Sequence, residues 1–194
     1  FSATLHQHSG GLFDITAGAL TRLWDLQSGE IPSAERINRV RHHVGWSRLE
    51  WRRPNLRLPV SGMALDLGGV VKEYAAERAA ELCRAQGVRH GVVDLGGDLA
   101  LIGAHADGQP WLVGIKSPQD RQIASARIDL TDGGLATSGD YERAMVIDGC
   151  RYSHIINPLT GYPVQSFASV SVAAANCLVA GAAATVAMLM GNLN

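Results

Sequence analysis

Two adjacent glycines followed by a cationic side chain form the stretch best suited to bind an anion. Gly68 and Gly69 follow a short apolar segment, and Lys72 lies three residues after the second glycine. A glycine turn that opens a helix presents free N–H groups and the positive end of the helix dipole, which favours phosphate. The pattern therefore predicts an anion site at residues 68–72, although a plain tight turn is the commoner explanation of two adjacent glycines.

A second polar stretch, residues 136–141, carries hydroxyl and backbone donors. Thr137, Ser138 and Gly139 could bind a phosphate from a turn, and Asp140 could contact the same ligand. The same residues would also make an ordinary capped β-turn, with Asp140 as an Asx cap. These residues alone leave both interpretations open.

His154 is the strongest candidate for proton transfer, because imidazole titrates near neutral pH. It precedes a polar loop with Asn157, Thr160 and Gly161, which the sequence places between two strands. Functional residues are common in such loops. A lone histidine is more often structural, so the role of His154 depends on what lies around it.

Two long helices and several short strands are expected to position these residues. Apolar side chains at helical spacing predict helices over residues 69–86 and 176–190, the second capped by Asn176. Shorter helices are expected at 16–26 and after Ser33, which could cap its helix. Strands are expected at 65–67, 89–94, 99–103, 111–115, 123–130, 144–147 and 166–172, with a hairpin formed by 46–51 and 56–58. Hairpin connections predict one largely antiparallel sheet with the two long helices packed on it, an α+β fold.

The composition is that of an ordinary globular protein. The chain has 194 residues, 46% hydrophobic and 18% charged, with a net charge of −1. That charge gives no electrostatic reason to expect nucleic acid or an anionic membrane surface as a partner. Cys83, Cys150 and Cys177 match neither a disulfide framework nor a zinc pattern. The uncharged run from 166 to 191 reads as a strand and a buried core helix, not a membrane span.

His6 and His8 stand two residues apart near the beginning of the chain. Two histidines at this spacing could hold a metal from one face of a strand. A solvated terminus is the commoner explanation of such a polar, glycine-rich stretch.

Four motifs together resemble the ApbE-type FAD:protein FMN transferases. They are Phe13-Asp-Ile-Thr-Ala-Gly-Ala-Leu20, Leu65-Asp-Leu-Gly-Gly-Val-Val-Lys72 with Val93-Asp-Leu-Gly-Gly-Asp98, Ala136-Thr-Ser-Gly-Asp-Tyr141, and His154-Ile-Ile-Asn-Pro-Leu-Thr-Gly-Tyr-Pro163. The resemblance runs from about Gly10 to Gly191. It implies a T-fold-like α+β architecture and cleavage of FAD with a divalent metal, Mg²⁺. By the same resemblance, the FMN would pass to a Thr or Ser hydroxyl of a target protein, with release of AMP.

The resemblance also implies roles for individual residues. The adenosine of FAD would lie near the start of the 69–77 helix, and the pyrophosphate between that turn and His154, which would act as the base. The residues expected to contact FAD are Gly68, Gly69, Lys72, Glu77, Ser138, Gly139, Asp140, Asn157, Thr160 and Gly161.

The chain departs from the family pattern at five positions. The family usually has Gly at 73, Asp at 77, Asp at 157 and Arg at 159, where this chain has Glu73, Glu77, Asn157 and Leu159. Leu159 lacks a cation that could pair with phosphate, and Glu73 adds negative charge near the expected anion site. Two alternatives stay open: a non-catalytic FAD-binding relative, or a pyrophosphatase that yields FMN and AMP.

The fifth departure affects the expected metal site, which the resemblance assigns to Gly69, Gly181, Ala184 and Thr185. The family holds its metal through an Asp at 181, a Thr at 185 and main-chain oxygens. Gly181 offers no carboxylate, so the sequence predicts an impaired metal site. A glycine in such an alanine-rich helix could also serve only to permit close packing, and that alternative stays open. The sequence also predicts that Gly181→Asp raises Mg²⁺-dependent FAD cleavage about tenfold, as 1.4 kcal/mol of transition-state stabilisation would.

The resemblance implies partners and a cellular location as well. The acceptor would be a redox protein carrying the modified Thr or Ser, and the enzyme would be periplasmic or membrane-anchored outside the cytoplasm. The whole chain is expected to be a single flavin-transferase domain without the N- and C-terminal segments of its relatives.

Overall fold

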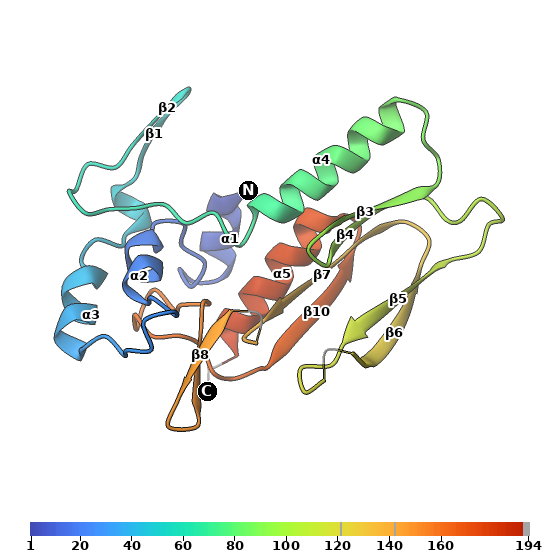
Figure 1. Cartoon of the computed structure of the whole chain (residues 1–194). Helices are drawn as coiled ribbons and strands as arrows, with labels where there is room; N and C mark the ends of the chain where they lie inside the picture. Colours follow the sequence, from blue (N-terminus) through green and yellow to red (C-terminus); the bar gives the residue numbers. More distant parts are fainter. Residues whose placement is uncertain (121, 142, 192–194) are drawn as a thin grey trace. The chain divides into compact units, whose positions relative to one another are not determined.

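A computed structural model describes residues 1–120, 122–141 and 143–191 (Figure 1). The chain forms two compact units. Unit 1 contains Phe1–Leu67, Asp140–Ala168 and the chain from Val186 onward, and unit 2 contains Gly68–Gly139 and Ser169–Thr185. The chain therefore passes from one unit to the other four times, and each unit is assembled from separate stretches of sequence.

Unit 1 contains short helices and two hairpins around a small apolar core. Its helices are α1 (Ser2–His8), α2 (Gly18–Leu23), α3 (Ala34–Arg41) and the 3₁₀ helix η1 (Trp46–Arg48); its hairpins pair β1 (Glu50–Arg52) with β2 (Asn55–Arg57) and β8 (Ala144–Ile147) with β9 (Cys150–Ser153). One buried cluster of this unit consists of Leu20, Trp24, Ile37, Met145 and Ile156. These residues come from three distant parts of the sequence, so the core holds the pieces of unit 1 together.

Unit 2 is built on a four-stranded antiparallel sheet. The strand order is β10 (Ser169–Ala174), β7 (Gly133–Gly139), β4 (Asp98–Ile102) and β3 (Gly91–Leu95). Helix α4 (Val71–Ala85) packs on β3 and β4, and a separate hairpin pairs β5 (Trp111–Lys116) with β6 (Ala124–Leu130). The helix can lie close to the sheet because Ala76 and Ala80, one turn apart, are fully buried.

Helix α5 (Cys177–Met190) begins in unit 2 and ends in unit 1. Cys177 is buried in the same cluster as Ala76 and Ala100. At Gly134 of β7 the helix start comes so close that a Cβ atom would lie 2.5 Å from the Cα of Cys177. Glycine is thus the residue that permits β7 to lie directly against the start of α5.

The structure confirms the α+β class, the antiparallel pairing and the two long helices. Ser33 caps α3 by accepting from the Arg36 N–H at 3.3 Å, and Asn176 caps α5 by accepting from the Val179 N–H at 2.8 Å. The expected buried helix is also present, with Ala180 and Met188 fully buried. Among the described residues, every helix falls short of what crossing a membrane requires.

Four expectations about local structure were wrong. Residues 65–67 form no strand; Ala64 makes only an isolated bridge with Ala17. Residues 137–139 lie in strand β7 instead of a turn, and residues 46–48 are a 3₁₀ helix instead of a strand. Within the described residues, the strands form one four-stranded and three two-stranded sheets, not a single sheet. The prediction that the chain is one domain stays a prediction.

Candidate functional site

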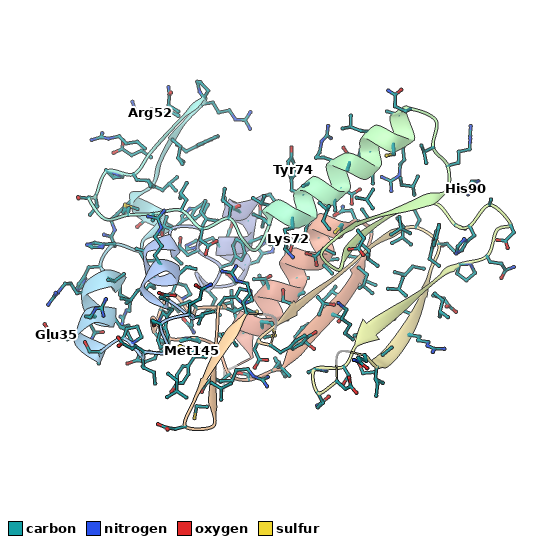
Figure 2. The ribbon with its side chains drawn as sticks, in the orientation of Figure 1. Glu35, Arg52, Lys72, Tyr74, His90 and Met145 are labelled. Atoms are coloured by element: carbon teal, nitrogen blue, oxygen red, sulfur yellow. The ribbon has the colours of Figure 1, made fainter. Side chains whose placement is uncertain are left out.

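The expected anion site lies at the start of α4, in unit 2. Gly68 and Gly69 form a turn before Val70, the N-cap residue, whose side chain makes no capping hydrogen bond. Lys72 follows in the first turn, as Figure 2 shows. The first N–H groups of a helix have no partner within the helix, so they and the Lys72 ammonium can both serve an anion there.

An ion pair fixes the position of Lys72. Its Nζ lies 2.6 Å from Oδ2 of Asp98, whose side chain is only 3% exposed whereas that of Lys72 is 55% exposed. The other Asp98 oxygen accepts a long hydrogen bond, 3.4 Å, from the Thr137 N–H on β7. Asp98 thus brings Lys72 to the strand that carries Thr137 and Ser138, as the expected FAD contacts require. The sequence analysis did not assign Asp98 a role.

The expected FAD-binding and metal-binding residues meet at a pair of hydroxyls. Ser138 Oγ on β7 lies 2.9 Å from Thr185 Oγ1 on α5, and Thr137 Oγ1 lies 2.7 Å from Ser171 Oγ on β10. Gly139 ends β7 opposite Ser169. Unit 2 therefore places the hydroxyl groups of Ser138 and Thr185 within reach of one ligand.

Glu77 and Asp140 already have partners inside the protein. Glu77 Oε2 accepts from the Cys177 N–H at 2.8 Å and so caps the start of α5, while its Oε1 lies 3.4 Å from Arg84 Nη1. Asp140, buried in unit 1, accepts from Arg151 Nη1 at 2.8 Å. Both carboxylates help to hold local structure, and their contacts with FAD stay predictions.

His154 lies in unit 1, immediately after β9, and is half-buried. Its Nδ1 lies 3.2 Å from the Arg143 carbonyl oxygen. Because a carbonyl can only accept, Nδ1 carries the proton and Nε2 is the nitrogen able to take one. The geometry is thus compatible with a general base.

The loop after His154 is braced by its own hydrogen bonds. Asn157 Oδ1 accepts from the Leu159 and Thr160 N–H groups at 2.8 and 3.3 Å. Gly161 has a φ of +80°, and its carbonyl accepts from Trp24 Nε1 at 2.8 Å. This explains why Asn at position 157 is compatible with the loop: its amide oxygen makes an Asx turn without needing a charge.

A pocket of about 410 Å³ lies in unit 1 and is lined in part by Pro158 and Leu159 of this loop. A stacked pair forms another part of its wall: His6 lies 4.9 Å from Trp46, centroid to centroid. His6 Nδ1 donates to the Phe13 carbonyl at 3.0 Å. Since α1 is helical, the idea that His6 and His8 bind a metal from a strand is wrong. The volume is typical of small-molecule sites, and sequence reasoning missed the pocket.

Glu73 in unit 2 is a buried acid whose side chain lacks a full set of hydrogen bonds. Only 4% of the residue is exposed, and its Oε2 has no hydrogen-bond partner. Burial raises the pKa of this carboxyl, as does the charge of Asp98, while a backbone hydrogen bond and Lys72 act in the opposite direction. A buried anion without a full set of partners is costly, so it needs a reason to be there.

Glu73 lies directly against Gly181. A Cβ atom at position 181 would come within 2.7 Å of Glu73 Oε1. The sequence-based prediction for Gly181→Asp places a new carboxylate at this position, whereas Glu73 already fills the space, as the close-packing alternative for this glycine implies. A single Gly181→Asp substitution is therefore expected to displace Glu73, not to add a ligand.

The residues around Glu73 fit a hard cation better than a soft one. In the described part of the chain, no group of three or more His, Cys, Asp or Glu side chains could hold a metal. One buried carboxylate with hydroxyl and carbonyl oxygens matches Mg²⁺, which also takes substrate phosphates as ligands.

Cys177 is expected to resist alkylation in the folded protein. Burial raises the pKa of its thiol to about 12, with the charges of Asp98, Glu73 and Glu77 adding to the effect and Lys72 opposing it. Only the thiolate attacks iodoacetamide, so at pH 8 the exposed Cys150 should be labelled first. Peptide mass spectrometry measures this, with a denatured sample as the control in which all three cysteines react. Equal labelling of Cys177 and Cys150 in the native protein would contradict this prediction.

Comparison with known proteins gives consistent matches across the chain. A profile described as the ApbE family matches residues 1–193. The chain is 33% identical over 187 residues to an FAD:protein FMN transferase of Vibrio cholerae, covering 93% of this chain and 56% of that protein. It is 35% identical over 191 residues to one of Escherichia coli K12, covering 93% of this chain and 54% of that protein.

Solved structures agree in fold. The crystal structure of the ApbE protein of Thermotoga maritima superposes with a TM-score of 0.90 at 35% identity, covering 98% of this chain and 64% of that one. The flavin transferase ApbE of Vibrio cholerae gives a TM-score of 0.85 at 32% identity, covering 97% of this chain and 62% of that one. The chain spans about half the length of the curated relatives it matches.

Proposed function

Because this chain belongs to the ApbE family, we propose that it is an FAD:protein FMN transferase. A hydroxyl oxygen of the acceptor attacks the FMN phosphorus of FAD. The bond from that phosphorus to the AMP oxygen breaks, and AMP leaves. The hydroxyl proton passes to a base, for which we propose His154.

The observation that best supports this proposal is the gathering of polar groups in unit 2. Lys72, held by Asp98, offers a cation, and the Ser138–Thr185 pair offers hydroxyls. Phosphoryl transfer depends mainly on positioning and on neutralising charge, which these groups can supply. Gly68 and Gly69 would add backbone N–H groups to the same phosphates.

Magnesium, the acceptor and the location form the finer part of the proposal. A bound Mg²⁺ would neutralise charge on the pyrophosphate, and Thr185 with the carbonyls of Gly69 and Ala184 would be among its ligands. The acceptor would be a redox protein modified on Thr or Ser, outside the cytoplasm. These points rest on the resemblance, because the relatives' names state only FAD, FMN and a protein acceptor.

The test is to incubate the purified protein with FAD, Mg²⁺ and a candidate acceptor, and to weigh the acceptor by mass spectrometry. We expect the mass of the acceptor to increase by that of one FMN less one water. The increase should be absent when the target Thr of the acceptor is replaced by Ala. Release of FMN and AMP without a heavier acceptor would indicate a pyrophosphatase instead. Binding of FAD without cleavage, at any Mg²⁺ concentration, would indicate a non-catalytic relative.

A further inference from the structure

The Glu73 carboxylate has the surroundings of a ligand that is still short of a partner. It lies in the first turn of α4, is 4% exposed, and leaves Oε2 without a hydrogen bond. Lys72 of the same turn, whose Nζ lies 2.6 Å from Asp98 Oδ2, makes no hydrogen bond to this Oε2. A buried carboxylate oxygen without a partner is unfavourable, so a cation bound at Oε2 would remove that penalty.

Glu73 also occupies the volume that a side chain at position 181 would need. The ideal Cβ of residue 181 falls 2.7 Å from Oε1 of Glu73, so the two positions share one space. The Glu73 carboxylate, which comes from α4, therefore occupies the space that a carboxylate at position 181 of α5 would occupy. The two departures from the family pattern, Glu at 73 and Gly at 181, compensate each other in space.

A hydroxyl side chain lies on α5 one helical turn after the glycine that Glu73 contacts. Thr185 follows Gly181 by four residues, which puts both on one face of α5. Thr185 Oγ1 lies 2.9 Å from Ser138 Oγ. Along one face of α5, the Glu73 carboxylate from α4 therefore lies against Gly181, and Thr185 one turn further on meets Ser138 of β7.

We infer that Glu73 supplies the carboxylate ligand for a divalent cation in this protein, replacing a carboxylate at position 181, with Thr185 as a second protein ligand. The inference rests on the proposed function for its metal, and it replaces the expectation of an impaired site. A hard ion such as Mg²⁺ or Mn²⁺ fits a site with one carboxylate and neutral oxygens.

The test measures metal binding directly. Mn²⁺ is titrated into the protein, with and without ADP, and free Mn²⁺ is followed by electron paramagnetic resonance; ADP carries a pyrophosphate but no flavin to transfer. We expect Glu73→Gln to weaken Mn²⁺ binding by more than about tenfold, a loss seen even for residues that only support a metal ligand. Glu81→Gln, which removes an exposed carboxylate from the same helix, should bind like the unmodified protein.

Equal Mn²⁺ affinity in Glu73→Gln and the unmodified protein would overturn the inference, as would no binding by the unmodified protein in either condition. Flavin transfer is measured separately. A protein that binds Mn²⁺ through Glu73 but modifies no acceptor would refute the proposed function and leave this inference standing.

A reciprocal pair of variants tests the shared space. Glu73→Gly alone should lose Mn²⁺ binding, and adding Gly181→Asp to it should restore binding at least tenfold, since the carboxylate then enters from α5. The single and the double variant both carry glycine at position 73 of α4. The destabilisation caused by that glycine is therefore the same in both and does not affect their comparison. If the double variant, folded by circular dichroism, binds no better than Glu73→Gly, the two positions do not serve one site and the inference fails.

Discussion

Replacing His154 with alanine is expected to slow FMN transfer by about a hundredfold or more, the usual contribution of a general base. The reason lies in the Arg143 contact: Nδ1 lies 3.2 Å from that carbonyl oxygen, which favours the tautomer with its proton on Nδ1 and its basic lone pair on Nε2. The measurement is the transfer rate at saturating FAD and acceptor. FAD affinity should change little, because the role concerns the reaction and not binding.

Two variants separate proton transfer from structure. His154→Asn keeps an N–H that can donate to the Arg143 carbonyl but has no basic nitrogen, so it should be as slow as His154→Ala. His90→Ala removes another histidine whose Nδ1 donates to a carbonyl, that of Ala104 at 2.8 Å, and should leave the rate unchanged. A fast His154→Asn enzyme would show that this residue only positions its neighbours.

Gly134→Ala is expected to destabilise the protein by about 3 kcal/mol, the upper end of the usual cost of overpacking. The added Cβ would lie 2.5 Å from the Cα of Cys177, and both partners are backbone held in a strand and a helix start. Neither can move as a flexible side chain could. Thermal or urea unfolding of the two proteins gives the difference.

Gly91→Ala is the matched control. Gly91 lies in β3 of the same sheet, but its nearest neighbours to an added Cβ are side-chain carbons at 3.8 and 4.0 Å, an ordinary contact. This variant should stay within about 1 kcal/mol of the unmodified protein. Equal stability of the Gly134 and Gly91 variants would mean that the start of α5 can yield, contrary to the packing described.

Residues with strong local signals were predictable from the sequence. The helices α4 and α5 and the capping residues Ser33 and Asn176 depend on signals within a few neighbours along the chain, and the structure has all of them. The inner face of α4 was predicted wrongly, because Val71 and Leu82 of the expected apolar stripe are exposed and Ala76 and Ala80 are buried instead. The strand Ala144–Ile147 was predicted with the same bounds. Interactions between residues close in the sequence thus determine where these elements form.

The sequence did not predict strand β7, because the contacts that stabilise it are made with residues distant in the sequence. Gly133–Gly139 has the small and polar residues of a turn, yet it lies between β4 and β10 and against the start of α5. Small residues serve there because neighbours approach closely, and those neighbours are distant in sequence. Propensity cannot indicate such packing.

Glu73 shows the same limit at the candidate site. The sequence identified Glu73 as a charge in an unfavourable place and Gly181 as a lost ligand, each by itself. Only the fold reveals that the two residues touch. The sequence did contain one signal of this contact. Relative to the family pattern, a carboxylate is gained at position 73 and lost at position 181.

Because the chain passes between the two units four times, genetic recombination cannot easily exchange either unit. A single genetic breakpoint anywhere between residues 68 and 185 divides the sequence of unit 2, and most such breakpoints separate strands that pair in its sheet. A gene fusion that imported residues 68–139 alone would bring β7 without β10, its partner over six residue pairs. Neither unit can therefore be exchanged as one continuous cassette, because each is encoded by separate stretches of sequence.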